Sequence, residues 1–251
     1  MLTLLVVLQI IVTAWWLFLQ RAPNEPGTWH FLFNGGYGLV FLVGGLGGLY
    51  QSFRLGGLRS TVGRAITFVS LGLTSYAIGQ FIWMVYNLIL TQEVPYPSVS
   101  DLFFIVATPL FGIGFWHLLR MYRTFITKRL ALELIIAFSL SSGVIILLIG
   151  PPDVSYDVNV AARFLNVFYP FADALLVSLA FVTFRTGGGT VDKSMVMFAV
   201  GMLLLSAADT LFTYRNNQEV YWNGDVSDLL FAFSGFFISY GVIRTVKSFI
   251  K

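Results

Sequence analysis

Two aspartates stand inside long apolar segments of this sequence, where an ionisable group could contact a polar ligand, a proton or a cation. Asp173 lies ten residues after Arg163 and twelve before Arg185, and Asp209 lies six residues before Arg215. A charged side chain at the centre of a bilayer costs about 3 kcal/mol on insertion scales, so such residues normally face protein or water. The structural alternative is a protonated or hydrogen-bonded aspartate that holds helices together.

Further polar side chains in the apolar segments map to the same half of the membrane when positions are counted from the loops. This clustering predicts an outward-facing polar cavity with aromatic groups in its wall, which would bind a small molecule. The alternative is that each group bonds to a neighbouring helix backbone. The candidate ligand-binding residues are Asp173, Asp209, Asn34, Tyr37, Gln80, Trp83, Asn87, Asn166 and Tyr169.

Two acidic stretches precede apolar segments with the spacing of a helix cap. Ser98 and Asp101 are three residues apart, as are Asp225 and Asp228. In a capping box the first side chain accepts from a free backbone N–H three residues on, and an acid favours the positive helix start. We interpret these four residues as structural caps, with a pair of cation-binding turns as the functional alternative.

The sequence lacks the residues that usually form catalytic, metal and cofactor sites. The sequence has no cysteine, and its two histidines, His30 and His117, fall at opposite ends of apolar segments, so they cannot ligate one haem. No lysine lies in mid-membrane, and no hydrolase, zinc-protease or phosphate-binding motif occurs. We therefore expect no enzyme activity, no metal and no cofactor.

The composition places the chain in a bilayer. Hydrophobic residues make up 57% of 251 and charged residues 11%, with a mean hydropathy of +0.81, whereas soluble domains are about 45–50% apolar and about 25% charged. The net charge of +3 is too small and dispersed to predict nucleic-acid binding. A crossing helix needs roughly 20 apolar residues. Eight segments qualify, which predicts an all-α integral membrane protein: about 2–20, 30–50, 64–91, 99–121, 130–150, 161–184, 194–214 and 226–247.

Basic residues in short loops predict the orientation, because they concentrate on the cytoplasmic side. Twelve of the fifteen would lie on one side, and only Arg21, Arg163 and Arg215 on the other. We expect a multi-pass protein of the cell membrane with both termini cytoplasmic. The glycine-rich segment 35–48 is expected to let neighbouring helices approach closely.

The sequence contains an internal similarity. Gln-Glu-Val occurs at 92–94 and 218–220, and Val-Ser-Asp-Leu at 99–102 and 226–229. These offsets of 126 and 127 residues predict an internal duplication, with two parallel four-helix repeats at 1–125 and 126–251. At an offset of 126 residues Trp83 stands opposite Asp209, and at an offset of 132 residues Phe41 stands opposite Asp173, so only the second half has acids at these positions inside the apolar segments. This asymmetry favours a one-sided site.

Three stretches together resemble the multi-pass membrane domains found ahead of prokaryotic diguanylate cyclases, phosphodiesterases and histidine kinases. They are Pro97 to Phe104 leading to Pro109, Tyr169 to Asp173, and Ala208-Asp209 with the later Ser227-Asp228. The resemblance covers roughly residues 65–245 and implies a sensory or anchoring input. The matching positions are Asp101, Pro109, Tyr169, Pro170, Asp173, Asp209 and Asp228.

Three functions are compatible with these features. The first is a stand-alone sensory or ligand-binding membrane module, which would need a partner protein because no output domain follows the last apolar segment. The second is a small-solute or proton-coupled transporter with Asp173 as the titrating group. The third is a structural subunit of a membrane complex.

Overall fold

Residues 1–21, 27–121, 127–155, 157–186 and 193–249 are described by the structure, a computed structural model. Within these ranges it contains eight long α-helices, a short 3-10 helix at Gly57–Arg59 and no β-strand. Each long helix is long and apolar enough to cross a membrane, so all eight predicted segments are confirmed to within a few residues. The helices are α1 (Leu2–Leu19), α2 (Thr28–Arg54), α3 (Thr61–Leu88), α4 (Val99–Met121), α5 (Lys128–Ile149), α6 (Val160–Thr186), α7 (Lys193–Asn217) and α8 (Val226–Phe249).

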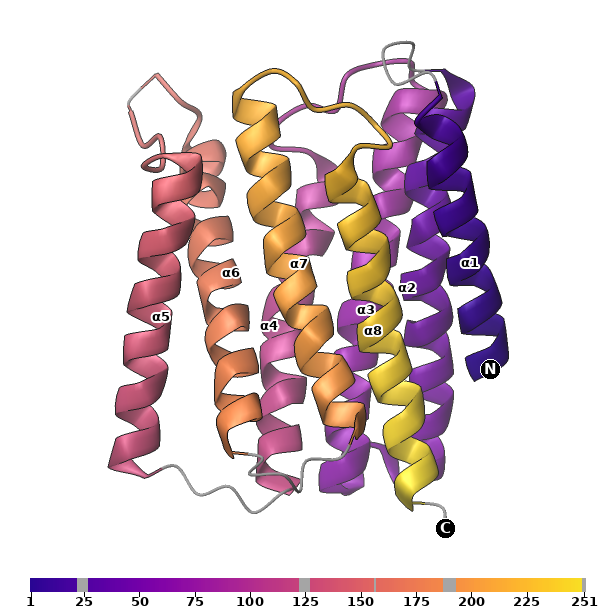
Figure 1. The fold of residues 1–251 in the computed structure, drawn as a ribbon, viewed down its shortest axis with the longest axis vertical. Coiled ribbons are helices and arrows are strands. Elements are labelled where there is room, and N and C mark those ends of the chain that lie inside the picture. The colour runs from indigo at the N-terminus through magenta and orange to yellow at the C-terminus, as the bar shows by residue number, and fades with distance from the viewer. Residues whose placement is uncertain (22–26, 122–126, 156, 187–192, 250–251) are drawn as a thin grey trace.

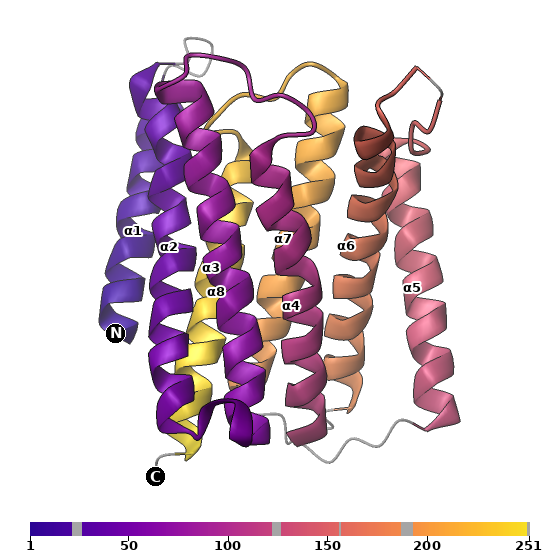
Figure 2. The ribbon, with the colours of Figure 1, turned by 180° about the vertical axis from the view of Figure 1, so that it is seen from behind.

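The helices stand side by side in two layers. In Figure 1, α7 and α8 lie in front of α2, α3 and α4, and Figure 2 shows the second layer from behind. Helix α8 packs against α2 and α7, and α3 packs against α2 and α4. Helix α1 covers one edge by contacting α2 and α8, while α5 and α6 form the other edge, with α6 also contacting α4 and α7.

The core lies mainly among α2, α3, α4, α7 and α8 and combines aliphatic side chains with stacked aromatic rings. Phe41 of α2 stacks on Tyr76 of α3 at 4.5 Å, and Phe115 of α4 stacks on Phe198 of α7 at 5.6 Å. Helix α5 contributes little to this core, and its Leu147 is 85% exposed. Exposed leucines are expected where a helix faces lipid instead of water.

The two ends of the bundle differ in charge. The α3–α4 connection at 89–98 and the α7–α8 connection at 218–225 lie at one end, which we name the loop end. Both Gln-Glu-Val turns are therefore at the same end, and each has a residue with positive φ beside it or in it, Thr91 at 50° and Glu219 at 58°. The opposite, basic end carries Arg54, Arg59, Arg64, Lys128, Arg129 and Lys193. The predicted boundary between residues 125 and 126 falls outside the described residues.

Glycines allow the close packing of the two layers. A Cβ atom on Gly45 of α2 would lie 2.9 Å from the backbone of α3, which confirms the close approach expected for segment 35–48. At Gly201 of α7, a Cβ atom would lie 2.8 Å from the backbone nitrogen of Ile238 in α8. Since backbone cannot move away as a flexible side chain can, these contacts require glycine.

Substituting Gly201 with alanine should lower the free energy of unfolding by about 1 to 3 kcal/mol, because the new methyl group forces α7 and α8 apart. Gly143 is the matched control, since a Cβ atom there would meet nothing within 4 Å. Gly143→Ala should be neutral or slightly stabilising because alanine favours helix. Thermal unfolding in detergent micelles measures both, and equal effects would contradict the packing described for α7 and α8.

Candidate functional site

A cavity of about 280 Å³ lies near the loop end, between α2, α3, α4, α6, α7 and α8. Exposed Asn216 and Asn217, at the end of α7, mark its mouth. Among the described residues that line it are four carboxyl groups and ten aromatic rings, but no lysine, arginine or histidine. The acids are Asp101, Asp173, Asp209 and Asp228, and the rings belong to Tyr37, Tyr76, Trp83, Tyr96, Phe104, Phe111, Tyr169, Phe212, Tyr221 and Phe231.

The structure brings seven of the nine predicted ligand-binding residues to this cavity. The two others, Asn34 and Asn87, do not line it. Asn34 donates to the side chain of Asn223, which also accepts from the indole of Trp83 at 3.1 Å. Asn87 donates to the backbone carbonyl of Trp83 at 3.0 Å. Asn87 therefore bonds to a helix backbone, which was the alternative to a role in ligand binding. The seven that meet are Tyr37, Gln80, Trp83, Asn166, Tyr169, Asp173 and Asp209.

Asp173 and Asp209 face each other from α6 and α7. Their side chains are joined by a hydrogen bond, and a hydrogen bond between two carboxyl groups requires a proton on one of them. Asp173 is only 5% exposed. Within the described part of the chain, neither acid has a basic partner.

Asp101 lies at the rim of the cavity, where it caps α4. Its carboxylate accepts from the Ser98 backbone N–H at 2.6 Å and from the Ser98 hydroxyl at 2.8 Å. The hydroxyl of Tyr169 also donates to it, at 2.6 Å. At the predicted cap of Ser98 and Asp101, the acid is thus the acceptor and Ser98 donates, and the same carboxylate connects α4 to α6.

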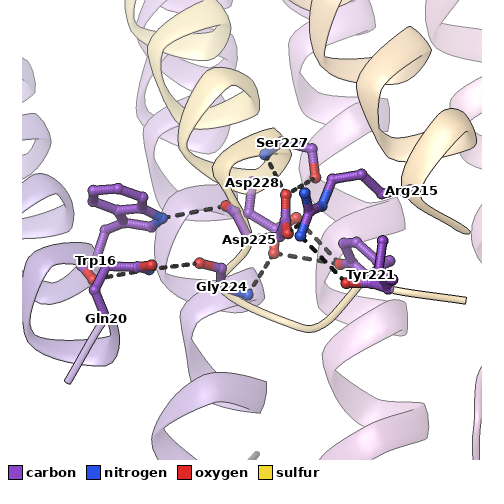
Figure 3. A network of polar contacts seen from close by, with 9 residues as sticks. Trp16, Gln20, Arg215, Tyr221, Gly224, Asp225, Ser227 and Asp228 are labelled. Atoms are coloured by element: carbon purple, nitrogen blue, oxygen red, sulfur yellow. Dashed lines mark hydrogen bonds and ion pairs between the residues drawn. The ribbon is translucent and has the colours of Figure 1, made fainter. Parts of the chain in front are cut away.

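Asp228 occupies a similar position at the start of α8, as Figure 3 shows. Its carboxylate accepts from the Gly224 backbone N–H at 2.6 Å and from the Tyr221 hydroxyl at 3.2 Å. Burial, reinforced by the nearby Asp228 carboxylate, raises the pKa of Tyr221, so this hydroxyl stays protonated and donates. Asp225, the other predicted cap, accepts from the Ser227 backbone N–H at 3.0 Å.

Asp225 also forms the ion pair that fixes the α7–α8 connection. Its buried carboxylate lies 2.6 Å from Nε of Arg215. Trp16 of α1 and Gln20, which follows α1, bind the same connection. Trp16 donates to the carbonyl of Asp225 at 3.2 Å, and Gln20 donates to the carbonyl of Gly224 at 2.9 Å. Figure 3 shows these contacts converging on one turn, which links α1, α7 and α8 beside the cavity.

An apolar groove of about 900 Å³ runs between α4, α5 and α6 and meets the cavity. Thr108 of α4 and Ala172 of α6 line both spaces. The groove is otherwise mainly aliphatic and aromatic, with Phe138, Phe164 and Phe171 among its walls. The cavity wall therefore borders a second, apolar space between α4 and α6.

Several cavity residues were not identified from the sequence. Asp101 and Asp228 were predicted as caps, with cation-binding turns as the alternative, and not as part of this cavity. The rings of Tyr76, Phe212 and Phe231 were not distinguished from core or lipid-facing residues. The recurrence of Ser-Asp at both helix starts was the one available signal for the two acids. In a chain with 17% aromatic residues, no comparable signal separated the rings.

Comparison with known proteins gives no match to a protein family, to a curated protein or to a solved structure. The fold defines an all-helical, multi-pass membrane protein.

Proposed function

We propose that this protein is a ligand-binding module of the cell membrane, which holds a small polar molecule in the loop-end cavity and acts with a partner protein. The observation that carries this proposal is the convergence of side chains from different helices. Seven polar or aromatic residues of α2, α3, α6 and α7, chosen from the sequence for their chemistry, line one cavity. Ligand sites combine an apolar wall with a few convergent polar groups in this way.

The interior of the bundle beyond the cavity supports ligand binding more than transport of a ligand through the protein. Toward the basic end, Phe115 and Phe198 stack on each other and are buried. A small void of about 10 Å³ lies there, lined mainly by aliphatic side chains such as Ile66 and Val242. A molecule that enters from the loop end would thus reach a closed floor.

Transport is the second candidate function, because the acid pair at the floor of the cavity could carry a proton. The hydrogen-bonded Asp173 and Asp209 can hold a proton between α6 and α7, as a proton-coupled carrier requires. The cavity would then be one of two alternating states. Proteoliposome uptake that disappears in Asp173→Asn would favour this candidate over a sensor.

A purely structural role fits Asp173 less well. An acid that holds helices together should bond to donors of the protein. In the described residues, the one partner of Asp173 is a second acid, Asp209.

We also infer that the chain consists of two like-oriented four-helix halves, with both termini cytoplasmic. The position of both Gln-Glu-Val turns at the loop end supports the first inference, and the arginines and lysines of the opposite end support the second. The loop end would then face outward, and the cavity would open to the outside.

Filling the cavity should abolish ligand binding. Ala172→Leu places three carbon atoms into its wall, so a compound that stabilises the wild-type protein in a thermal-shift screen should lose that effect. A ligand at about 100 times its dissociation constant stabilises by about 2.7 kcal/mol, or about 5 to 10 °C for a chain of this size. The screen uses the full chain in a neutral detergent and a chemically diverse library.

Ala161→Leu is the matched control, because Ala161 lies on the same helix but is exposed and outside the cavity. It should retain every stabilising compound. Compounds that stabilise both variants equally, or a library without any stabilising compound, would refute the proposed binding function.

A further inference from the structure

The four carboxyl groups of the cavity differ in what already binds them. Asp101 and Asp228, near the loop end, each accept a backbone N–H and a tyrosine hydroxyl. Asp173, 95% buried, has no protein N–H or O–H donor among the described residues, apart from the acid proton it shares with Asp209. The acids that accept no N–H or tyrosine hydroxyl from the described residues are therefore at the floor of the cavity, where a ligand would be most enclosed.

The charge of the cavity has no counterion within the described protein. No basic side chain lines it, and the nearest candidate in sequence, Arg215, is paired with Asp225 at 2.6 Å instead. Uncompensated carboxylates in a low-dielectric site are costly. A positively charged ligand would both neutralise them and donate hydrogen bonds, whereas an anion would be repelled by the ionised acids.

The surroundings suit an organic cation better than a metal ion. Among the described residues, no three acids or histidines are arranged to hold a metal, and Ca²⁺ prefers about six to eight oxygen ligands. Aromatic rings, by contrast, bind alkylated ammonium groups through their negative faces. Trp83 and Phe212, 5.8 Å apart in an edge-to-face pair, belong to the cavity wall together with Asp209.

We propose that the cavity binds a small organic cation, with its ammonium group at the Asp173–Asp209 pair and its carbon groups against Trp83, Phe212 and the neighbouring rings. This inference rests on the proposed binding function and specifies its ligand class. The volume of about 280 Å³ limits the ligand to a small molecule of this class.

The test measures binding of matched probes to the full chain in a neutral detergent by calorimetry. The cationic probes are methylammonium, butylammonium, tetramethylammonium and choline. The neutral probe is 3,3-dimethylbutan-1-ol, which has the shape of choline without its charge, and glycine betaine adds a carboxylate. Choline should bind about thirty-fold more tightly than its neutral isostere, since a desolvated cation–π contact alone is of this order.

Two variants separate the charge from the rings. Asp209→Asn should weaken the best cationic probe at least about ten-fold without changing the neutral isostere, and Trp83→Leu should weaken alkylated cations more than methylammonium. Asp153→Asn, in the exposed 150–155 loop, is the control and should change neither. If Asp209→Asn does not fold, the organic-cation proposal is still tested by the relative affinities of the probes for the wild type and by the effect of Trp83→Leu.

The outcomes distinguish the ligand class from the function. Tighter binding of the isostere or of glycine betaine, or failure of all four cations, would overturn the organic-cation proposal. If compounds of another charge class then lose binding in Ala172→Leu, the cavity remains a binding site. If no compound of any class depends on Ala172, the proposed function fails as well.

Discussion

Arg215→Gln should lower the free energy of unfolding by about 2 to 4 kcal/mol, because it leaves a buried carboxylate without its counterion. Asp225 is almost completely buried, and Arg215 is about one-third exposed. Removing one partner of a buried pair costs about 3 to 5 kcal/mol, and the partial exposure of the guanidinium reduces this figure. The loss should appear as a lower thermal midpoint in detergent micelles.

Arg129→Gln is the matched control for this prediction. Arg129 pairs with Glu133 at 3.1 Å, but it is 79% exposed, so its loss should cost less than about 1 kcal/mol. The double variant Arg215→Gln/Asp225→Asn should regain part of the lost stability, since no buried charge is then left unpaired. Equal destabilisation by Arg215→Gln and Arg129→Gln would mean that Asp225 is hydrated, and would contradict the burial of its carboxylate.

The eight helices were predictable because one strong physical requirement fixes them. A segment in lipid must satisfy its backbone internally, so roughly 20 apolar residues indicate a helix whatever its neighbours are. The starts of α4 and α8 were predictable for a local reason, namely the caps at Asp101 and Asp228. Neither requirement depends on which helix lies beside which.

The cavity was predictable only in part, because its wall depends on helix rotation and packing. Asn87 and Trp83 are four residues apart and therefore near each other on α3, yet Trp83 lines the cavity while Asn87 bonds to the backbone of its own helix. Polarity alone could not separate these two roles. The acids Asp173 and Asp209 were easier to identify, since few arrangements other than a cavity or a partner tolerate them in the membrane.

The stability of variants at Asp173 distinguishes a ligand-binding acid from an acid that holds helices together. Asp173→Asn should leave the ligand-free protein as stable as the wild type or about 1 to 3 kcal/mol more stable, because an amide at mid-membrane is less costly than a carboxyl group that can ionise. The amide can also donate to Asp209, which keeps the contact between α6 and α7. The same substitution should abolish binding of the ligand that stabilises the wild type.

Asp101→Asn is the matched comparison, because it makes the same chemical change in the same cavity. This carboxylate accepts three hydrogen bonds, at 2.6, 2.8 and 2.6 Å, so the amide should destabilise by about 1 to 3 kcal/mol. Thermal unfolding of the two variants without ligand should therefore shift in opposite directions, or shift only for Asp101→Asn. If Asp173→Asn is instead the more destabilising variant, the acid pair holds α6 to α7, and the floor of the cavity is structural. Opposite shifts would mean that the protein retains Asp173 at a cost to its own stability, as proteins do at sites that act on a ligand.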